Sequence, residues 1–128
     1  MYNKNIEQEE IYIRLINKSE DFIEKNLSKN ISLSDLAENA NFSQYHFHRI
    51  FKKYSNETVN DFITRFKLER VAIFISVNKD ISLTDVALDY GYSDYSYFSK
   101  SFKKYFGCSP SIYRKEQERT STFKKDMK

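Results

Sequence analysis

Hydrophobic side chains recur at helical spacing along most of this chain, and one such pattern occurs twice. Residues 43–55 place four apolar side chains at i, i+3, i+4 and i+7, the spacing of one stripe along a helix: Phe47, Ile50, Phe51 and Tyr54. Residues 95–105 repeat this stripe with Phe98, Phe102 and Tyr105. Both segments are therefore expected to be amphipathic helices whose stripes pack inward.

Residues 58–77 carry two apolar stripes on opposite sides. The first stripe consists of Val59, Phe62, Ile63, Phe66, Ile73, Phe74 and Val77, and the second of Leu68, Val71, Ala72 and Ile75. A helix that is apolar on two sides is buried between two bodies, so this segment is expected to be a linker helix. At 1.5 Å per residue it spans about 28 Å, which is comparable to the roughly 34 Å of one DNA turn.

The segment before the first copy of the repeat predicts one more amphipathic helix. Residues 6–27 carry most of their acidic side chains on one face and an apolar stripe on the other: Tyr12, Leu15, Ile16, Ser19, Phe22, Ile23 and Leu27. This helix is expected to cover the first repeated unit.

The repeat extends beyond the apolar stripes. An offset of 50 aligns ISLSDLAENANFSQY (31–45) with ISLTDVALDYGYSDY (81–95), and from Phe47 onward the offset is 51. The chain is therefore a duplicated supersecondary unit with one residue inserted in the second copy. The expected organisation has four parts: an N-terminal helix plus a first helix-turn-helix (1–57), a linker helix (58–77), a second helix-turn-helix (78–116), and a polar tail or the start of a linker (117–128).

Local signals within each copy indicate a helix, a tight turn and a second helix. Helix-capping chemistry is expected at Ser34 and Thr84, beside Asp35 and Asp85. The first helix of each copy should end at a residue type that tolerates the left-handed conformation, and a serine should cap the second helix two residues later. These positions are Asn41 and Gly91 for the turns, and Ser43 and Ser93 for the caps.

Composition narrows the fold class. The 128 residues include only two Gly and one Pro, so few breaks between helices and an all-α fold are expected. A lone Cys108 excludes an internal disulfide and a cysteine zinc site. The N-terminus lacks the pattern of a secretory signal, and no apolar run approaches the roughly 20 residues of a membrane span, so a cytoplasmic protein is expected.

The positive charge is concentrated in the repeat. The net charge is +3, from 21 basic and 18 acidic residues; residues 1–40 hold five basic and eight acidic side chains, residues 41–70 hold six and three, and residues 71–128 hold ten and seven. No acidic residue occurs in 43–54 or 95–105. A modest total charge with clustered basic faces is compatible with a nucleic acid partner.

The second helix of each copy is expected to face outward with polar and basic side chains. In the first copy these are Tyr45, His48, Arg49 and Lys52, flanked by His46 and Lys53; in the second they are Ser96, Ser99, Lys100 and Lys103, flanked by Tyr97 and Lys104. One lysine-rich helix alone is more often a solvated face. Two such faces at equivalent positions of two helix-turn-helix units favour binding to DNA.

Metal and enzyme chemistry are not expected. His46 and His48 are two residues apart, which separates them by about 200° around a helix, so they cannot chelate one ion together. His48 is expected to donate to a base or phosphate, whereas for His46 a position at the rim without a specific role is an equal alternative. The sequence shows no glycine-rich phosphate loop, no metal cluster and no nucleophilic triad. No cofactor is therefore expected.

The stretch YGYSDYSYFSKSFKKYFGCSPSIYR (90–114) resembles the signature of the bacterial AraC/XylS transcription activators. The agreeing positions are Gly91, Tyr97, Phe98, Phe102, Lys103, Lys104, Phe106, Gly107, Pro110, Tyr113 and Arg114. FITRFKLERVAIFI resembles the linker helix of the family, and the resemblance covers about residues 8–116; Asn41 stands where a glycine is usual. It implies seven helices, two helix-turn-helix subdomains joined by a long linker helix, and insertion of both recognition helices into adjacent major grooves.

The resemblance also implies roles for individual residues. It implies base contacts from Tyr45, His48, Arg49, Tyr95, Ser96, Tyr97 and Lys100, and phosphate contacts from Lys52, Lys53, Lys104 and Ser109. The expected outward position of Ser99 and Lys103 adds Ser99 to the base contacts and Lys103 to the phosphate contacts. For Tyr95, packing against the core is an equal alternative. Arg49 is the strongest candidate, because a guanidinium can grip guanine O6 and N7 together. The implied partners are double-stranded DNA, bound by a monomer, and RNA polymerase.

Alternatives remain for the domain organisation, for the function and for the kind of nucleic acid that is bound. NFSQYHFHRIFK (41–52) resembles the branch in which a GyrI-like domain follows the DNA-binding unit, whereas a stand-alone regulator of the MarA and SoxS type is the other possibility. No segment of the sequence is expected to form a sensor pocket. A helical protein-interaction module that docks its basic faces on an acidic partner is the rival function. RNA is disfavoured, because an A-form major groove does not admit a recognition helix.

Overall fold

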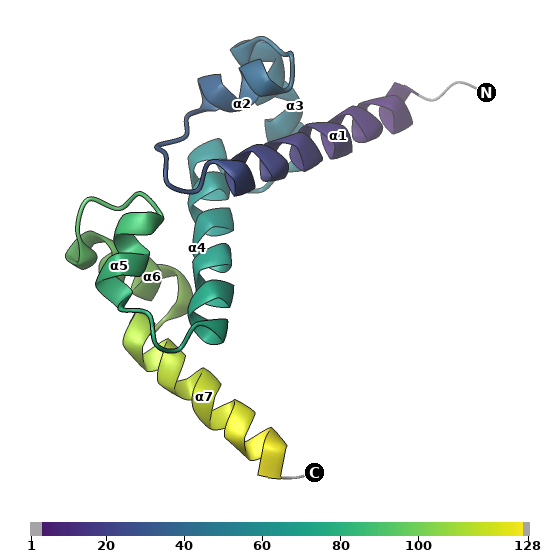
Figure 1. Cartoon of the computed structure of the whole chain (residues 1–128). Helices are drawn as coiled ribbons and strands as arrows, with labels where there is room; N and C mark the ends of the chain where they lie inside the picture. The colour runs from purple at the N-terminus through teal and green to yellow at the C-terminus, as the bar shows by residue number, and fades with distance from the viewer. Residues whose placement is uncertain (1–3, 127–128) are drawn as a thin grey trace. The chain divides into compact units, whose positions relative to one another are not determined.

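The structure is a computed structural model, and it describes the backbone of residues 4–126 and the side chains of residues 5–120. Seven α-helices and no strand occur in this part of the chain (Figure 1). They are α1 (Lys4–Lys25), α2 (Leu33–Asn39), α3 (Gln44–Tyr54), α4 (Val59–Val77), α5 (Leu83–Asp89), α6 (Tyr95–Phe106) and α7 (Pro110–Asp126). The all-α fold with seven helices is thus confirmed. No described helix is long and apolar enough to cross a membrane.

The chain divides into two compact units, with the boundary between Phe66 and Lys67 inside α4. The first unit contains α1, α2, α3 and the N-terminal half of α4. The second contains the C-terminal half of α4 with α5, α6 and α7 (Figure 1). Each unit has a hydrophobic core of its own.

The core of the first unit is built from the stripes that the sequence predicts. The α1 stripe contributes Leu15 and Ile23, and between them Ser19 is fully buried with its hydroxyl donating to the carbonyl oxygen of Leu15 at 2.7 Å. Phe51 packs edge to face on Phe62 of α4, with ring centroids 5.7 Å apart. The buried members of this core are Leu15, Ile23, Leu36, Ala37, Ala40, Phe47, Ile50, Phe51, Val59, Phe62, Ile63 and Phe66.

The core of the second unit is smaller and has the same plan. Its buried members are Leu68, Val71, Ala72, Ile75, Val86, Ala87, Phe98 and Phe102. Phe102 packs against the tilted ring of Phe106, with centroids 4.5 Å apart, and edge to face against Tyr113, with centroids 5.4 Å apart. Arg114 of α7 donates to three backbone oxygens, those of Ile75, Asn78 and Ile81, and so ties α7 to the segment between α4 and α5.

The predicted first stripe of α4 is wrong in its C-terminal half. Val59, Phe62, Ile63 and Phe66 are buried in the first unit, but Ile73 is 56% and Val77 is 73% exposed. The second stripe, Leu68, Val71, Ala72 and Ile75, supplies the other core instead. Each half of α4 therefore buries only one side, and the buried side changes at the unit boundary.

The apolar stripe of α6 is also shorter than predicted. Phe98 and Phe102 are completely buried, whereas Tyr105 is 43% exposed and its hydroxyl donates to Glu69 Oε1 of α4 at 2.8 Å. A tyrosine can lie at the edge of a core because its ring packs while its hydroxyl reaches a polar partner. The equivalent Tyr54 of α3 is half-buried against the ring of Tyr12, 5.2 Å away.

Three of the predicted helix caps are wrong, and two of these lie at the first helix of each copy. Ser32 and Ser82 cap α2 and α5, not Ser34 and Thr84, because the helices begin at the leucines that precede those residues. Ser32 and Asp35 form a capping box: the Asp35 amide donates to Ser32 Oγ at 3.2 Å, and the Ser32 amide donates to Asp35 Oδ2 at 2.9 Å.

The two turns differ by one residue at their ends. Asn41 and Gly91 both adopt the predicted left-handed conformation, with φ of 62° and 86°. Ser43 caps α3 as predicted, but α6 is capped by Asp94 and not by Ser93. The residue inserted in the second copy therefore lengthens the turn and moves the cap along by one position.

Candidate nucleic-acid interface

The outward face of α3 is exposed along its whole length. Its four predicted members, Tyr45, His48, Arg49 and Lys52, are all exposed, and Tyr45 reaches 76%. On the opposite side, Phe47, Ile50 and Phe51 anchor the helix in the first core. The N-cap bond from the His46 amide to Ser43 Oγ, at 3.1 Å, sets where the helix begins. An amphipathic helix held in this way presents its polar side chains on a rigid support.

Both flanks of α3 are hollowed. A hollow of about 500 Å³ is lined by His46, Arg49, Ile50 and Lys53 together with Gln8 of α1. A second hollow of about 410 Å³ lies at the other flank and is lined by His48, Phe51, Lys52 and the loop that leads to α4. The two histidines line different hollows, as their spacing predicts. Basic groups thus border α3 on both sides.

Lys53 is held by a residue that the sequence analysis did not identify. Its ammonium donates to Gln8 Oε1 of α1 and lies 5.4 Å from the centre of the Tyr54 ring. Gln8 is 45 residues away in the chain, and no motif or spacing marks it. Only the packing of α1 against α3 brings this amide to the basic flank.

Glu57, the acidic residue in the loop after α3, is paired with a cation within the first unit. Glu57 accepts from Arg65 Nε at 3.1 Å and from Arg65 Nη2 at 2.6 Å, so the guanidinium grips the carboxylate with two nitrogens. Arg65 also lies 5.5 Å from the centre of the Phe62 ring. With its charge paired to α4, Glu57 detracts less from the positive field next to Lys52.

The outward face of α6 is basic and hydroxyl-rich. Ser96, Lys100, Lys103 and Lys104 are exposed, and Tyr97 is 60% exposed. Ser99 is half-buried, so less of its hydroxyl side is open than the sequence suggests. Tyr95 lies on the apolar flank, packed against Phe98 with ring centroids 6.0 Å apart. In the isolated chain, Tyr95 therefore packs against the second core, as the alternative prediction for this residue states.

Tyr97 is supported from the turn before α6. Its ring lies 5.8 Å from the ring of Tyr92, which in turn packs 5.1 Å from buried Phe98. Burial, and to a smaller extent the nearby Tyr97, raises the pKa of Tyr92 to about 12. Tyr92 is uncharged at neutral pH, as an unperturbed tyrosine would be, and its raised pKa extends this uncharged range to higher pH while its ring supports Tyr97.

Ser109 lies at the start of α7 and acts there as a capping residue. Its hydroxyl accepts from the Ile112 amide at 3.3 Å, and its carbonyl oxygen accepts from the Tyr113 amide at 2.9 Å. Pro110 follows at the first helical position, where a missing amide hydrogen costs nothing. The first turn of α7 therefore presents a helix N-terminus, the backbone feature that favours contact with phosphate.

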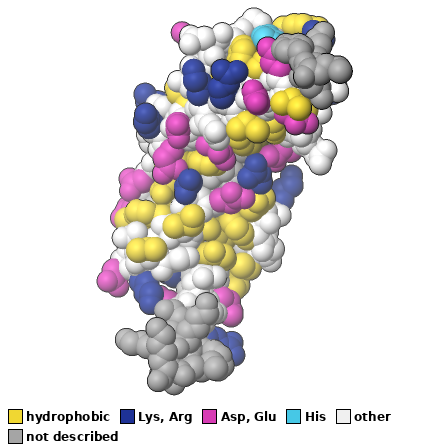
Figure 2. All heavy atoms as spheres, turned by 90° about the vertical axis from the view of Figure 1, so that its right-hand side faces the viewer, with side chains coloured by type: hydrophobic (Ala, Val, Ile, Leu, Met, Phe, Trp, Pro, Cys, Tyr) yellow, Lys and Arg dark blue, Asp and Glu magenta, His cyan; other side chains and the backbone are white. Residues whose placement is uncertain are grey.

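The charge of these two helices differs from that of the side of the molecule drawn in Figure 2. Figure 2 shows one side of the molecule, on which acidic and basic side chains are interspersed. By contrast, neither α3 nor α6 carries an acidic side chain. Among the side chains that the structure describes, no three His, Cys, Asp or Glu residues gather as a metal site would require.

Similarity to known proteins was found over most of the chain. The sequence profile of a helix-turn-helix domain family matches residues 36–116, which is more than half of the chain. The chain is 32% identical over 93 residues to the HTH-type transcriptional activator AarP of Providencia stuartii, a match that covers 73% of this chain and 68% of that protein. It is 31% identical over 101 residues to the Msm operon regulatory protein of Streptococcus mutans serotype c, covering 79% of this chain.

Those matches differ in how much of each relative they cover. The chain spans only 36% of the Msm operon regulatory protein, so most of that regulator has no counterpart here.

Among solved structures, a DNA-binding transcriptional dual regulator from Escherichia coli K-12 superimposes with a TM-score of 0.73 at 20% identity. That match covers 85% of this chain and 93% of the other, and it shows that the fold is shared.

Proposed function

The chain belongs to the AraC/XylS family of helix-turn-helix transcription regulators, and from this premise we propose that both of its units bind one DNA site. It is a sequence-specific DNA-binding transcription regulator. In the proposed complex, α3 is the recognition helix of the first unit and α6 that of the second. Each enters a major groove, and the two grooves follow one another along the same duplex.

The observation that carries this proposal is the equivalence of the two outward faces. α3 and α6 are each the second helix of a helix-turn-helix, each is anchored by buried phenylalanines, and each presents basic side chains without a single acidic one. A positive helix face of this kind suits the major groove, which is wide enough for an α-helix and is bordered by phosphates. A protein-interaction module would not require two such faces at matched positions.

The two units differ in the chemistry that they offer to bases. In the first, Arg49 is proposed to grip a guanine, with Tyr45 and His48 as further readers and Lys52 and Lys53 near phosphate. In the second, Ser96, Tyr97, Ser99 and Lys100 are the proposed readers, with Tyr95 beside them. Serine hydroxyls pair with either kind of base, so the first unit should discriminate more sharply. Lys103, Lys104 and the α7 N-terminus at Ser109 are proposed to contact the backbone.

Further partners follow from the same premise. A regulator that binds promoter DNA acts by changing the access or activity of RNA polymerase, which is the proposed protein partner. Two reading units in one chain need no second copy for a bipartite site, so a monomer is the proposed DNA-binding form. The cytoplasm, where DNA and polymerase are found in bacteria, is the proposed location.

The test is a selection of bound sites from a random duplex library at near-physiological salt. A recovered motif in two parts, with centres about 10.5 base pairs apart, is expected. In a parallel selection, Arg49→Ala should lose information in one half only. Lys79→Ala, an exposed lysine outside both faces, is the matched control and should recover the parental motif. No enrichment over random sequence would overturn the proposal and favour binding to an acidic protein.

A further inference from the structure

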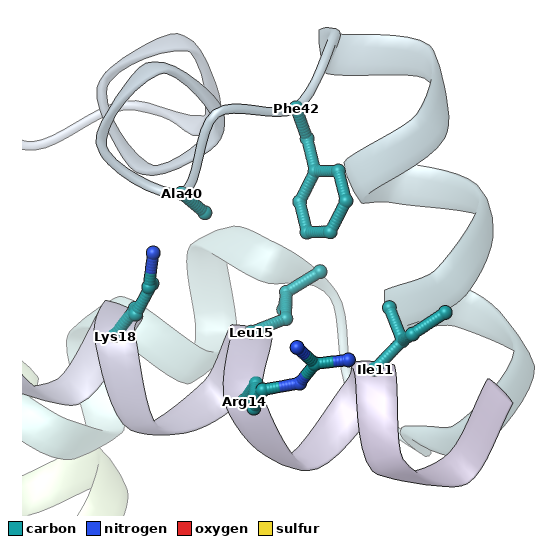
Figure 3. Close-up of a pocket in the computed structure, with 6 residues that line it drawn as sticks. All are labelled: Ile11, Arg14, Leu15, Lys18, Ala40 and Phe42. Carbon is teal, nitrogen blue, oxygen red and sulfur yellow. The ribbon is translucent and has the colours of Figure 1, made fainter. Parts of the chain in front are cut away.

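A pocket in the first unit shares no residue with the outward face of α3. Its volume is about 300 Å³, at the lower end of the range typical of small-molecule sites. α1 contributes Ile11, Arg14, Leu15 and Lys18, and the turn between α2 and α3 contributes Ala40 and Phe42 (Figure 3). The pocket thus lies against the turn that positions the recognition helix, although the sequence predicts no sensor pocket.

The floor of this pocket is apolar. Leu15 is 1% and Ala40 is 7% exposed, while Ile11 and Phe42 are half-buried. In Figure 3, the Phe42 ring points toward Leu15 and Ile11 and leaves open space above α1. An apolar group placed there would cover carbon surface that water now touches, which favours its binding.

Two cationic side chains, Arg14 and Lys18, lie at the rim of the pocket. Arg14 and Lys18 are four residues apart on α1, so both project from the same side of the helix. Both are exposed, and no carboxylate among the described side chains pairs with either of them. Figure 3 shows the Lys18 side chain extending from α1 toward Ala40, and the Arg14 guanidinium beside Leu15. An apolar floor therefore meets two cations that have no ion-pair partner among the described side chains.

We propose that this pocket binds a small organic anion with an apolar body, such as an aryl or short-chain alkyl carboxylate. The carboxylate would meet Arg14, whose guanidinium matches it with two parallel donors, and Lys18 as a second charge. The apolar body would rest on Ile11 and Phe42, the two half-buried members of the floor, above Leu15 and Ala40. An inorganic anion would leave the apolar floor exposed to water, and a neutral molecule would leave both cations without a counter-charge. Neither therefore fits the site as well.

The pocket is connected to the recognition helix by one side chain. The Phe42 ring meets the His46 imidazole edge to face with centroids 4.8 Å apart, and the Phe42 amide donates to the Ala37 carbonyl oxygen at 2.9 Å. Phe42 follows Asn41, whose left-handed conformation forms the turn. A ligand that contacts Phe42 should therefore alter the surroundings of His46, in the first turn of α3.

The test is a titration of the ¹⁵N-labelled chain, followed by two-dimensional NMR in the absence of DNA. Benzoate, 1-naphthoate and octanoate are the probes, because they share a carboxylate and differ in the size of the apolar body. At least one should give saturable shifts confined to amides of residues 11–18 and 40–46. The neutral 1-naphthamide should bind about tenfold more weakly than 1-naphthoate, since it lacks the charge.

Substitutions of the two rim cations test their contribution to binding separately from that of the apolar floor. Arg14→Gln and Lys18→Gln should each weaken binding of the anionic probe about threefold to tenfold and leave 1-naphthamide binding unchanged. Lys25→Gln is the matched control, an exposed lysine of α1 outside the pocket, and should change nothing. All three side chains are exposed, and equal melting temperatures would show that the fold is kept.

Three outcomes would overturn the proposal. The first is that none of the three carboxylates shifts the pocket amides. The second is equal binding of 1-naphthoate and 1-naphthamide, which would show an apolar hollow without anion selectivity. The third is that an acidic peptide containing a leucine binds in the pocket while none of the small carboxylates does, which would assign the pocket to a protein partner. Because no DNA is present, each result is independent of the proposed DNA site.

Discussion

Ile73 and Ile75 are two residues apart in α4, yet Ile75 is fully buried in the second core while Ile73 is 56% exposed. The same residue type in the same helix therefore has two different energetic roles. Burial of Ile75 removes its side chain from water, whereas Ile73 stays largely in solvent in the isolated chain. This contrast corrects the sequence-based expectation that Ile73 belongs to a continuous stripe with Phe66.

Ile75→Ala should lower the free energy of unfolding by about 2–5 kcal/mol, because it leaves a cavity in a small core. Ile73→Ala should change it by no more than about 0.5 kcal/mol, the usual effect of a surface substitution. Urea unfolding of the two variants, followed by circular dichroism, measures both values. Equal losses would show that Ile73 is buried in solution.

The caps give a second stability contrast. Ser32→Ala should destabilise the first unit by about 1 kcal/mol, since the Asp35 amide loses its acceptor. Ser34→Ala, two residues away in the same helix, removes an exposed hydroxyl and should have little effect. The same urea titrations apply. A larger loss for Ser34→Ala would place the start of α2 where the sequence analysis expected it.

The pKa of Tyr92 predicts a loss of stability at high pH. Burial raises that pKa from the usual 10.0 to about 12, so the folded state holds the proton more tightly than the unfolded chain. The resulting contribution is fully present below pH 10 and is lost as the pH rises through 12. Tyr92→Phe should flatten this part of the stability profile, measured as urea midpoints between pH 9 and about 12. An unchanged slope in the variant would show that Tyr92 does not titrate abnormally.

Arg49 and the lysines of α6 should differ in the kind of affinity they supply. Arg49→Ala should cost about 1–3 kcal/mol on the selected site and relax preference at one base pair. Lys103→Ala or Lys104→Ala should weaken selected and random duplexes about equally, and reduce the salt slope by about 1. Fluorescence anisotropy over a series of salt concentrations measures both effects. Equal loss of preference in all three variants would contradict the assigned roles.

Spacing between the half-sites tests whether α4 acts as a fixed joint. Each inserted base pair turns one half-site by about 34° and moves it by about 3.4 Å, by the roughly 10.5-base-pair repeat. About five inserted pairs place the halves on opposite faces of the duplex, so affinity should fall to that of one half-site. Gel shifts with spacers lengthened by zero to ten pairs provide the measurement. Affinity that does not depend on spacer length would mean that the two units bind as independently tethered modules.

Features that depend on local periodicity and backbone preference were predictable from the amino-acid sequence alone. The inward and outward faces of α3 follow from the 3.6-residue repeat, and the buried Phe47 and the exposed Tyr45 lie where the pattern puts them. The turns at Asn41 and Gly91 follow from the few residue types that tolerate a positive φ. The predicted cap at Ser34 is wrong, although the Ser-x-x-Asp spacing of the capping box formed by Ser32 and Asp35 is local and can be recognised in a sequence.

Which apolar side chains reach a core, and which polar side chains contact each other, depends on how the helices pack. Periodicity places Ile73 in line with buried positions, but the change of buried side at the unit boundary leaves it in solvent. The bond from Lys53 to Gln8, and the pocket that joins Arg14 to Phe42, bring together residues that are distant in the chain. Such contacts depend on how α1 packs against the helix-turn-helix, and no spacing within a single helix encodes that packing.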